Sequence, residues 1–102
     1  MALVLVMVTF PDEDSAKSMI EKVLNERLAA CILHKQVNSS YIWQGQNQEE
    51  QEVLVLFKTN KTNFEQLEQY ISTHHPYDIP AILKIDASAN QDYQNWIDSI
   101  IS

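Results

Sequence analysis

The sequence predicts an α+β fold whose elements follow the order strand, helix, two strands, helix, strand and a final helix. An unbroken apolar run opens the chain, and two later stretches carry apolar residues at steps of three and four. Segments rich in β-branched and aromatic residues lie between and after those stretches. The length of 102 residues and the 45% hydrophobic content suit one compact core. We therefore expect a single domain over residues 1–102.

The first strand and the first helix are predicted within residues 2–30. Residues 2–10, ALVLVMVTF, are apolar without alternation, which is typical of a central strand. Pro11 ends this strand, and Asp12 is a candidate N-cap ahead of an acidic first turn. An apolar stripe then predicts a helix that reaches about Ala30, formed by Ala16, Met19, Ile20, Val23, Leu24 and Leu28.

A long β-hairpin is predicted after this helix. The segments CILHKQV and SSYIWQ, at 31–37 and 39–44, precede the apolar run VLVLFKT at 53–59. Gly45, the only glycine in the sequence, stands in the polar stretch between them, where the chain must turn. Cys31, at the end of the predicted helix, is expected to be a buried small side chain.

The remaining elements are a second helix, a fourth strand and a terminal helix. The second helix begins near Asn60 and stops near His74, because Pro76 disfavours a helical backbone at the residue before it. One side of it carries Phe64, Leu67, Ile71 and His74. AILKIDA, at 81–87, forms the fourth strand. The terminal amphipathic helix contains Tyr93, Trp96, Ile97, Ile100 and Ile101.

This order is the split pattern of a ferredoxin-like βαββαβ sandwich with an additional C-terminal helix. In such a sandwich both main helices cover one face of an antiparallel sheet. The other face then has only the terminal helix to cover it. We therefore expect that face to be buried against further copies of the chain in a closed cyclic assembly.

Composition excludes several classes of partner. The net charge is −7, and the seven Lys and Arg residues form no cluster, so a nucleic-acid partner is not expected. The longest apolar stretch is about half the length of a membrane span, so no membrane insertion is expected. One cysteine gives no sign of an oxidising compartment, and we expect a cytoplasmic protein.

Several short strings along the chain are informative when they are taken in order. They are TFPD at 9–12, RLAAC at 27–31, SSYIWQG at 39–45, Glu52 six residues before Lys58 and Thr59, HHPYDIP at 74–80 and YQNWI at 93–97. Together they resemble the CutA divalent-cation tolerance family. The resemblance covers nearly the whole chain. It implies a homotrimer with an architecture similar to that of the PII signalling proteins, and a function in tolerance of copper or other divalent cations.

The resemblance also implies a metal site at His74 and His75. Imidazole is a good ligand for Cu²⁺ and other divalent cations. Val8 stands where the family has a cysteine on the first strand, and Ala81 stands where it usually has Glu. Adjacent residues point in different directions, so convergence of copies would be needed for a shared site. In the alternative interpretation, His74 completes the apolar side of its helix and His75 forms hydrogen bonds in the turn.

A second candidate site is a pocket between subunits. The hairpin and the loop at 75–80 could bring together Tyr41, Trp43, Glu52, Lys58 and Tyr77. A carboxylate and an amine in an aromatic pocket would suit an anionic or zwitterionic ligand. Alternatively, these residues only stabilise contacts between subunits.

No catalytic motif accompanies these sites. The sequence contains no Gly-Xaa-Ser-Xaa-Gly, no phosphate-binding glycine loop and no His-Glu-Xaa-Xaa-His. We therefore predict a non-enzymatic protein of divalent-cation tolerance without an organic cofactor. The rival prediction is a small-molecule-binding or signalling trimer similar to PII, and a purely structural assembly is a third.

Overall fold

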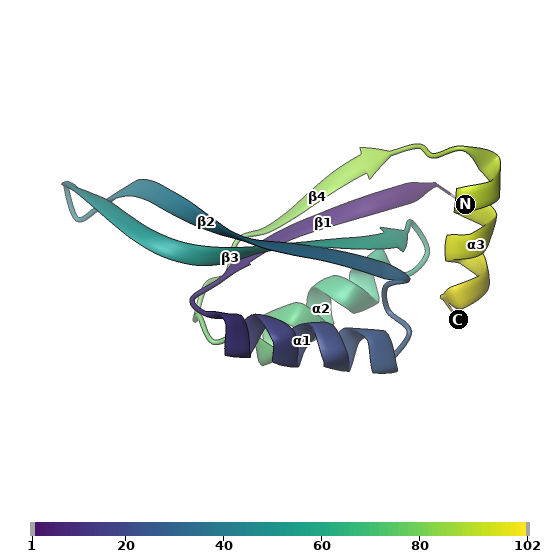
Figure 1. Cartoon of the computed structure of the whole chain (residues 1–102), viewed down its shortest axis with the longest axis horizontal. Helices are drawn as coiled ribbons and strands as arrows, with labels where there is room; N and C mark the ends of the chain where they lie inside the picture. Colours follow the sequence, from purple (N-terminus) through teal and green to yellow (C-terminus); the bar gives the residue numbers. More distant parts are fainter. Residues whose placement is uncertain (1, 102) are drawn as a thin grey trace.

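A computed structural model of the chain describes residues 2–101 (Figure 1). The order of the elements is the predicted one. They are β1 (Leu3–Phe10), α1 (Glu13–Asn25), β2 (Cys31–Trp43), β3 (Gln46–Asn60), α2 (Phe64–His74), β4 (Ile82–Ala87) and α3 (Gln91–Ile100). No helix in the described part of the chain is long and apolar enough to cross a membrane.

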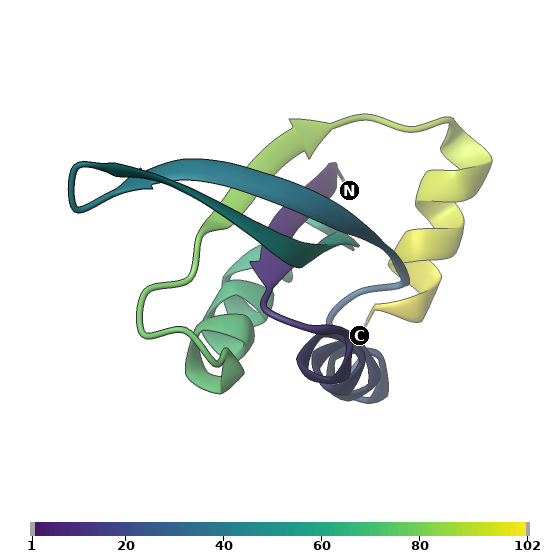
Figure 2. The same cartoon turned by 60° about the vertical axis from the view of Figure 1, so that its left-hand side comes forward.

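The four strands form one antiparallel sheet in the order β2-β3-β1-β4. Helices α1 and α2 lie side by side on the same face of this sheet, as Figures 1 and 2 show. Alternate residues of β1 and β3 point toward the helices and form the core with Ala16, Met19, Val23, Leu67 and Ile71. The predicted α+β fold and the central position of the first strand are therefore confirmed.

The β2–β3 hairpin is much longer than the rest of the sheet. β3 pairs with β1 only from Val53 onward, whereas β2 and β3 stay paired as far as Trp43 and Gln46. Residues 38–51, here called the hairpin arm, therefore project beyond the core (Figure 2). Gln44 and Gly45 close the arm with φ values of 51° and 76°, which are typical of a two-residue type I′ turn.

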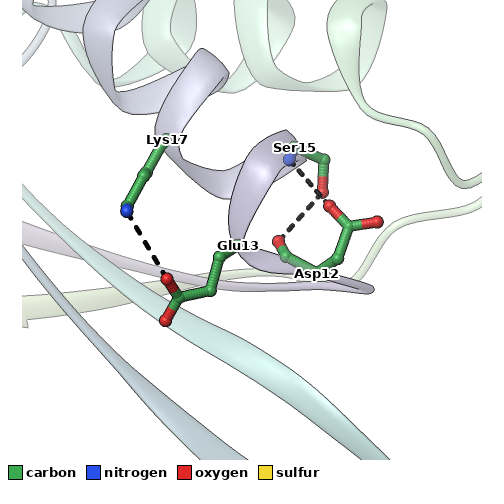
Figure 3. A network of polar contacts seen from close by, with 4 residues as sticks. All are labelled: Asp12, Glu13, Ser15 and Lys17. Atoms are coloured by element: carbon green, nitrogen blue, oxygen red, sulfur yellow. Dashed lines mark hydrogen bonds and ion pairs between the residues drawn. The ribbon is translucent and has the colours of Figure 1, made fainter.

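The predicted cap of α1 is present. Asp12 Oδ1 accepts a 2.8 Å hydrogen bond from the Ser15 backbone N–H, and the Ser15 hydroxyl donates to the Asp12 carbonyl at 3.1 Å (Figure 3). These bonds to Ser15 lower the pKa of the Asp12 carboxyl. An ion pair between Lys17 and Glu13, at 3.5 Å, follows on the first turns of the helix.

α1 ends at Asn25, five residues before the predicted end at Ala30. Arg27 has a φ of 58°, and the Leu28 N–H donates to the Val23 carbonyl at 3.1 Å, so the chain turns out of the helix in a left-handed cap. The apolar stripe continues through this turn because Leu28 still packs into the core. Cys31 consequently begins β2 instead of ending the helix, and it is half-buried.

One face of the sheet remains open. It is formed by Leu5, Met7, Leu33, Leu54, Leu56, Leu83 and Ile85, which occupy matching register positions on the four strands. Leu33 and Leu83 are 52% and 54% exposed. α3 covers only the end of this open face near Leu3, where Ile97 and Ile101 pack. The expected uncovered apolar face is therefore present in the single chain.

Candidate functional site

The His74 ring lies at the exposed end of α2. Its Nδ1 is 2.9 Å from the Tyr70 carbonyl, and its ring stacks on the Tyr70 ring with centroids 4.2 Å apart. Because a carbonyl can only accept, Nδ1 carries a proton, and in the neutral ring Nε2 then keeps its lone pair. The alternative interpretation expected His74 to complete the apolar side of the helix. This part of it is wrong, because His74 is exposed and only Leu67 and Ile71 are buried on α2.

His75 has the opposite arrangement. The residue is only 9% exposed, and its ring stacks on Phe10 at a centroid distance of 4.5 Å. Nε2–H donates to the Thr9 carbonyl at 2.9 Å, while Nδ1 accepts from the Tyr77 N–H at 3.0 Å. Burial lowers the pKa of His75, although Thr9 and Glu52 oppose this effect. His75 therefore forms the expected hydrogen bonds in the turn and is neutral at physiological pH.

These contacts limit what a single chain offers a metal ion. The His74 ring is held against α2 and the His75 ring against β1, so the two do not chelate together. Within residues 2–101, no three His, Cys, Asp or Glu side chains are grouped closely enough to hold an ion. Val8 is buried in the core. Of these two rings, only that of His74 has a nitrogen, Nε2, without a hydrogen-bond partner among residues 2–101, and this nitrogen can form one coordination bond.

Four of the five predicted pocket residues do come together. Tyr41 and Trp43 from β2, Glu52 from β3 and Tyr77 from the loop after α2 line a cavity of about 640 Å³. We call this cavity the aromatic hollow; its other lining residues are Ser39, Gln48, Glu50 and Ile79. The hollow lies where the hairpin arm leaves the core, on the side of the open face.

Hydrogen bonds tie the phenols of the hollow to its carboxylates. The Tyr77 hydroxyl donates to Glu52 Oε2 at 2.8 Å, and the Tyr41 hydroxyl donates to Glu50 Oε1 at 2.7 Å. Burial and the bond to Glu52 raise the pKa of Tyr77, and the bond to Glu50 raises the pKa of Tyr41. Both phenols are therefore protonated donors at neutral pH.

Lys58, the fifth predicted member, lies elsewhere. Lys58 and Glu52 lie on the same face of β3. Because they are six residues apart on an extended strand, their backbones are roughly 20 Å apart. The Lys58 ammonium donates to the Tyr93 hydroxyl at 3.2 Å and lies 5.2 Å from the centre of that ring. Within one chain the amine thus anchors α3 and does not reach the hollow.

Sequence reasoning missed Glu50 and Ile79 as members of the hollow. Glu50 was detectable, because residues two apart on a strand share a face and Glu50 precedes Glu52 by two. Ile79 was harder to find. It lies in the loop between the two prolines, Pro76 and Pro80, where no periodic pattern indicates direction.

Known proteins resemble this chain in both sequence and fold. Residues 4–100 match the family model described as CutA1 divalent ion tolerance protein. The chain belongs to this family. The divalent-cation tolerance protein CutA of Pyrococcus horikoshii is 38% identical over 96 residues, which cover 93% of this chain and 94% of that protein. The Yersinia pestis CutA is 39% identical over 98 residues, covering 94% and 82%.

Solved CutA structures have the same fold. The crystal structure of CutA1 from Pyrococcus horikoshii superposes with a TM-score of 0.93 at 36% identity, covering 97% of this chain and 98% of that one. CutA from Synechococcus elongatus superposes with a TM-score of 0.95 at 30% identity, covering 99% and 91%. The resemblance inferred from the short strings is confirmed at the level of the family.

Proposed function

We propose that this CutA chain acts in divalent-cation tolerance as a cytoplasmic, non-enzymatic homotrimer that binds Cu²⁺ or another divalent cation through His74. The family supports the tolerance function by its description. Metal binding is supported by the His74 ring, whose Nδ1–H donates to the Tyr70 carbonyl while Nε2 has no hydrogen-bond partner among residues 2–101. Metal-binding histidines are commonly oriented in this way by a backbone acceptor.

The trimer is supported by the open face of the sheet. Apolar side chains on a surface of this kind are favourably buried against copies of the same chain, and closed rings are the usual solution. Assembly also matters for the metal, because one exposed imidazole binds weakly. Three copies around an axis can supply three imidazoles or add carboxylates from a neighbour. We propose a PII-like arrangement in which the hairpin arm reaches the adjacent subunit.

His75 is assigned a different part in this proposal, although the family resemblance pairs it with His74. Both of its ring nitrogens are already used, by Thr9 and Tyr77. Coordination through either nitrogen would break a hydrogen bond of a buried side chain, which is costly. His75 therefore positions the loop at 75–80, and His74 provides the metal contact.

Native mass spectrometry of metal-free protein titrated with Cu²⁺ tests this proposal, since it reports assembly and stoichiometry together. The wild-type trimer is expected to take up copper in a fixed ratio, and His74→Ala is expected to lower its affinity about ten-fold or more. His34→Ala is the matched control, because His34 is an exposed histidine on β2. Copper uptake that is equal in wild type and His74→Ala would reject the site.

The second candidate function is binding of a small molecule in the aromatic hollow, as in a signalling trimer. The observation that favours it is Glu52, a residue only 9% exposed that lines a cavity large enough for a metabolite. Saturable binding that needs Glu52 and is unaffected by His74→Ala would support this function over metal binding.

A further inference from the structure

Glu52 is a mostly buried residue whose carboxylate has no positively charged partner among residues 2–101. Its side-chain hydrogen bond comes from a neutral donor, the Tyr77 hydroxyl. The ion pairs among residues 2–101 involve Lys17 with Glu13 and Lys84 with Asp86, and none reaches Glu52. Burying a carboxylate costs free energy unless a cation compensates its charge, so a positively charged group near Glu52 would be stabilising.

The groups around Glu52 in the described part of the chain do not neutralise its charge. His75, which faces Glu52, is buried and neutral, and both of its nitrogens are occupied. Lys35 stands opposite Leu54 on the neighbouring strand but forms no ion pair in this part of the chain. Glu50 adds a second carboxylate to the same wall. The hollow therefore has a negative potential, which repels an anionic ligand, one of the two ligand types (anionic or zwitterionic) that the sequence suggested.

The walls of the hollow are suited to a cation of organic character. Tyr41, Trp43 and Tyr77 contribute three aromatic rings, and Trp43 is 61% exposed, so its own chain leaves much of it uncovered. Aromatic faces attract ammonium and guanidinium groups, and Trp does so best. A bare metal ion fits less well, because no group of three or more ligating side chains is present among residues 2–101.

We propose that the aromatic hollow binds the ammonium or guanidinium group of a small organic cation. Glu52 and Glu50 supply the compensating charge, and Trp43 with the two tyrosines covers the apolar part of the ligand. The cavity of about 640 Å³ has room for a compact amine with a short carbon chain. This inference rests on the second proposed function and is independent of copper binding at His74.

Isothermal titration calorimetry with n-butylguanidinium and n-butylammonium tests the inference on the assembled protein. Phosphate buffer is required, because Tris and imidazole are themselves organic cations. Wild-type protein is expected to bind both cations saturably, and Glu52→Gln and Trp43→Ala are each expected to weaken binding about ten-fold. Trp43→Ala keeps the test decisive if Glu52→Gln folds poorly, since Trp43 is largely exposed.

Glu49→Gln is the matched control for charge. Glu49 lies on the same strand as Glu50 but on the opposite face, and it does not line the hollow. The Glu49→Gln substitution removes the same charge as Glu52→Gln and is expected to leave binding of the two cations unchanged. If Glu49→Gln weakens binding as much as Glu52→Gln, the effect is general surface electrostatics and the proposal is wrong.

Three other outcomes also overturn the proposal and can be told apart. Saturable binding of neutral n-butyramide or anionic butyrate in place of the cations would keep a small-molecule function but reject cation recognition. If none of the probes binds, both the small-molecule function and cation recognition are rejected. If Glu52→Gln shifts native mass spectra from assemblies to single chains, the carboxylate instead pairs with a basic side chain of a second copy.

Discussion

His75 connects three parts of the molecule through one side chain. It donates to Thr9 at the end of β1, accepts from Tyr77 in the loop after α2 and stacks on Phe10. Tyr77 in turn donates to Glu52, so the loop, the central strand and the aromatic hollow share one hydrogen-bonded chain. A change at His75 should therefore affect both the stability of the fold and the position of Tyr77.

His75→Phe tests this role because it keeps the ring and removes both hydrogen bonds. The Thr9 carbonyl and the Tyr77 N–H then lose their partner, which is expected to lower the free energy of unfolding by about 1–3 kcal/mol. Chemical denaturation with urea measures the difference. Thr73→Ala is a suitable control, since its hydroxyl bonds only the exposed Gln69 carbonyl one turn back. An unchanged midpoint for His75→Phe would contradict the role.

The same site should make stability depend on pH. The folded-state pKa of His75 lies below its ordinary value of about 6.5, so the unfolded chain binds the proton more readily. This histidine's contribution is complete above about pH 6.5 and is lost as the pH falls from there toward the folded-state pKa. The advantage of wild type over His75→Phe should therefore shrink on acidification, measured by urea titrations at several pH values. An advantage that grows instead would show that protonation stabilises the native state.

The sequence predicted contacts between residues close together in the chain better than contacts between distant ones. Asp12 and His75 could be assigned from the sequence because an N-cap and a pre-proline turn are local features. Lys58 could not, because its partner Tyr93 is 35 residues away and only the packing of α3 brings them together. The four pocket residues that do meet were predictable because two of them alternate on one strand and face the open side.

At the scale of elements, the end of α1 depends on one backbone conformation. Arg27 adopts a φ of 58°, which is costly for a residue with a Cβ atom and is usually taken by glycine. The sequence predicted a longer helix because the apolar spacing continues to Leu28, which packs into the core from the turn. Hydrophobic periodicity reports which side is buried and does not report where the hydrogen-bonded helix stops.

Arg27→Gly is expected to stabilise the protein. Glycine reaches this conformation without steric cost, so the free energy of unfolding should rise by about 1 kcal/mol. Arg27→Ala is the matched control, because alanine also removes the side chain but keeps the Cβ atom and the strain. Thermal unfolding followed by circular dichroism compares the variants. If Arg27→Gly and Arg27→Ala have the same stability, the left-handed conformation is not the origin of the effect.

At the scale of the whole molecule, the sheet has two unequal faces. One is covered by α1 and α2, and the other exposes an apolar surface next to an aromatic hollow. The period of the strands predicted both faces, but the sequence of one chain does not specify how copies meet. The distribution of charge adds a constraint, since Glu52 lies near one end of the open face and Lys58 at the other. Each chain therefore carries this carboxylate and this amine at opposite ends of the surface that copies would share.

Leu33→Glu tests whether the open face holds the assembly together. Leu33 is 52% exposed in the single chain, so the substitution should leave the fold of each subunit intact. In a trimer each new carboxylate would be buried without a partner, at a cost of roughly 3 kcal/mol per copy or about 9 kcal/mol per trimer. Because the half-assembly concentration of a trimer varies as the square root of its dissociation constant, that concentration should rise about 1000-fold. Leu24→Glu is the control, because Leu24 is an exposed leucine on α1, away from that face. Light scattering coupled to size exclusion should show single Leu33→Glu chains and Leu24→Glu trimers. Trimers of Leu33→Glu at high dilution would place the contact between copies elsewhere, with the hairpin arm the next segment to test.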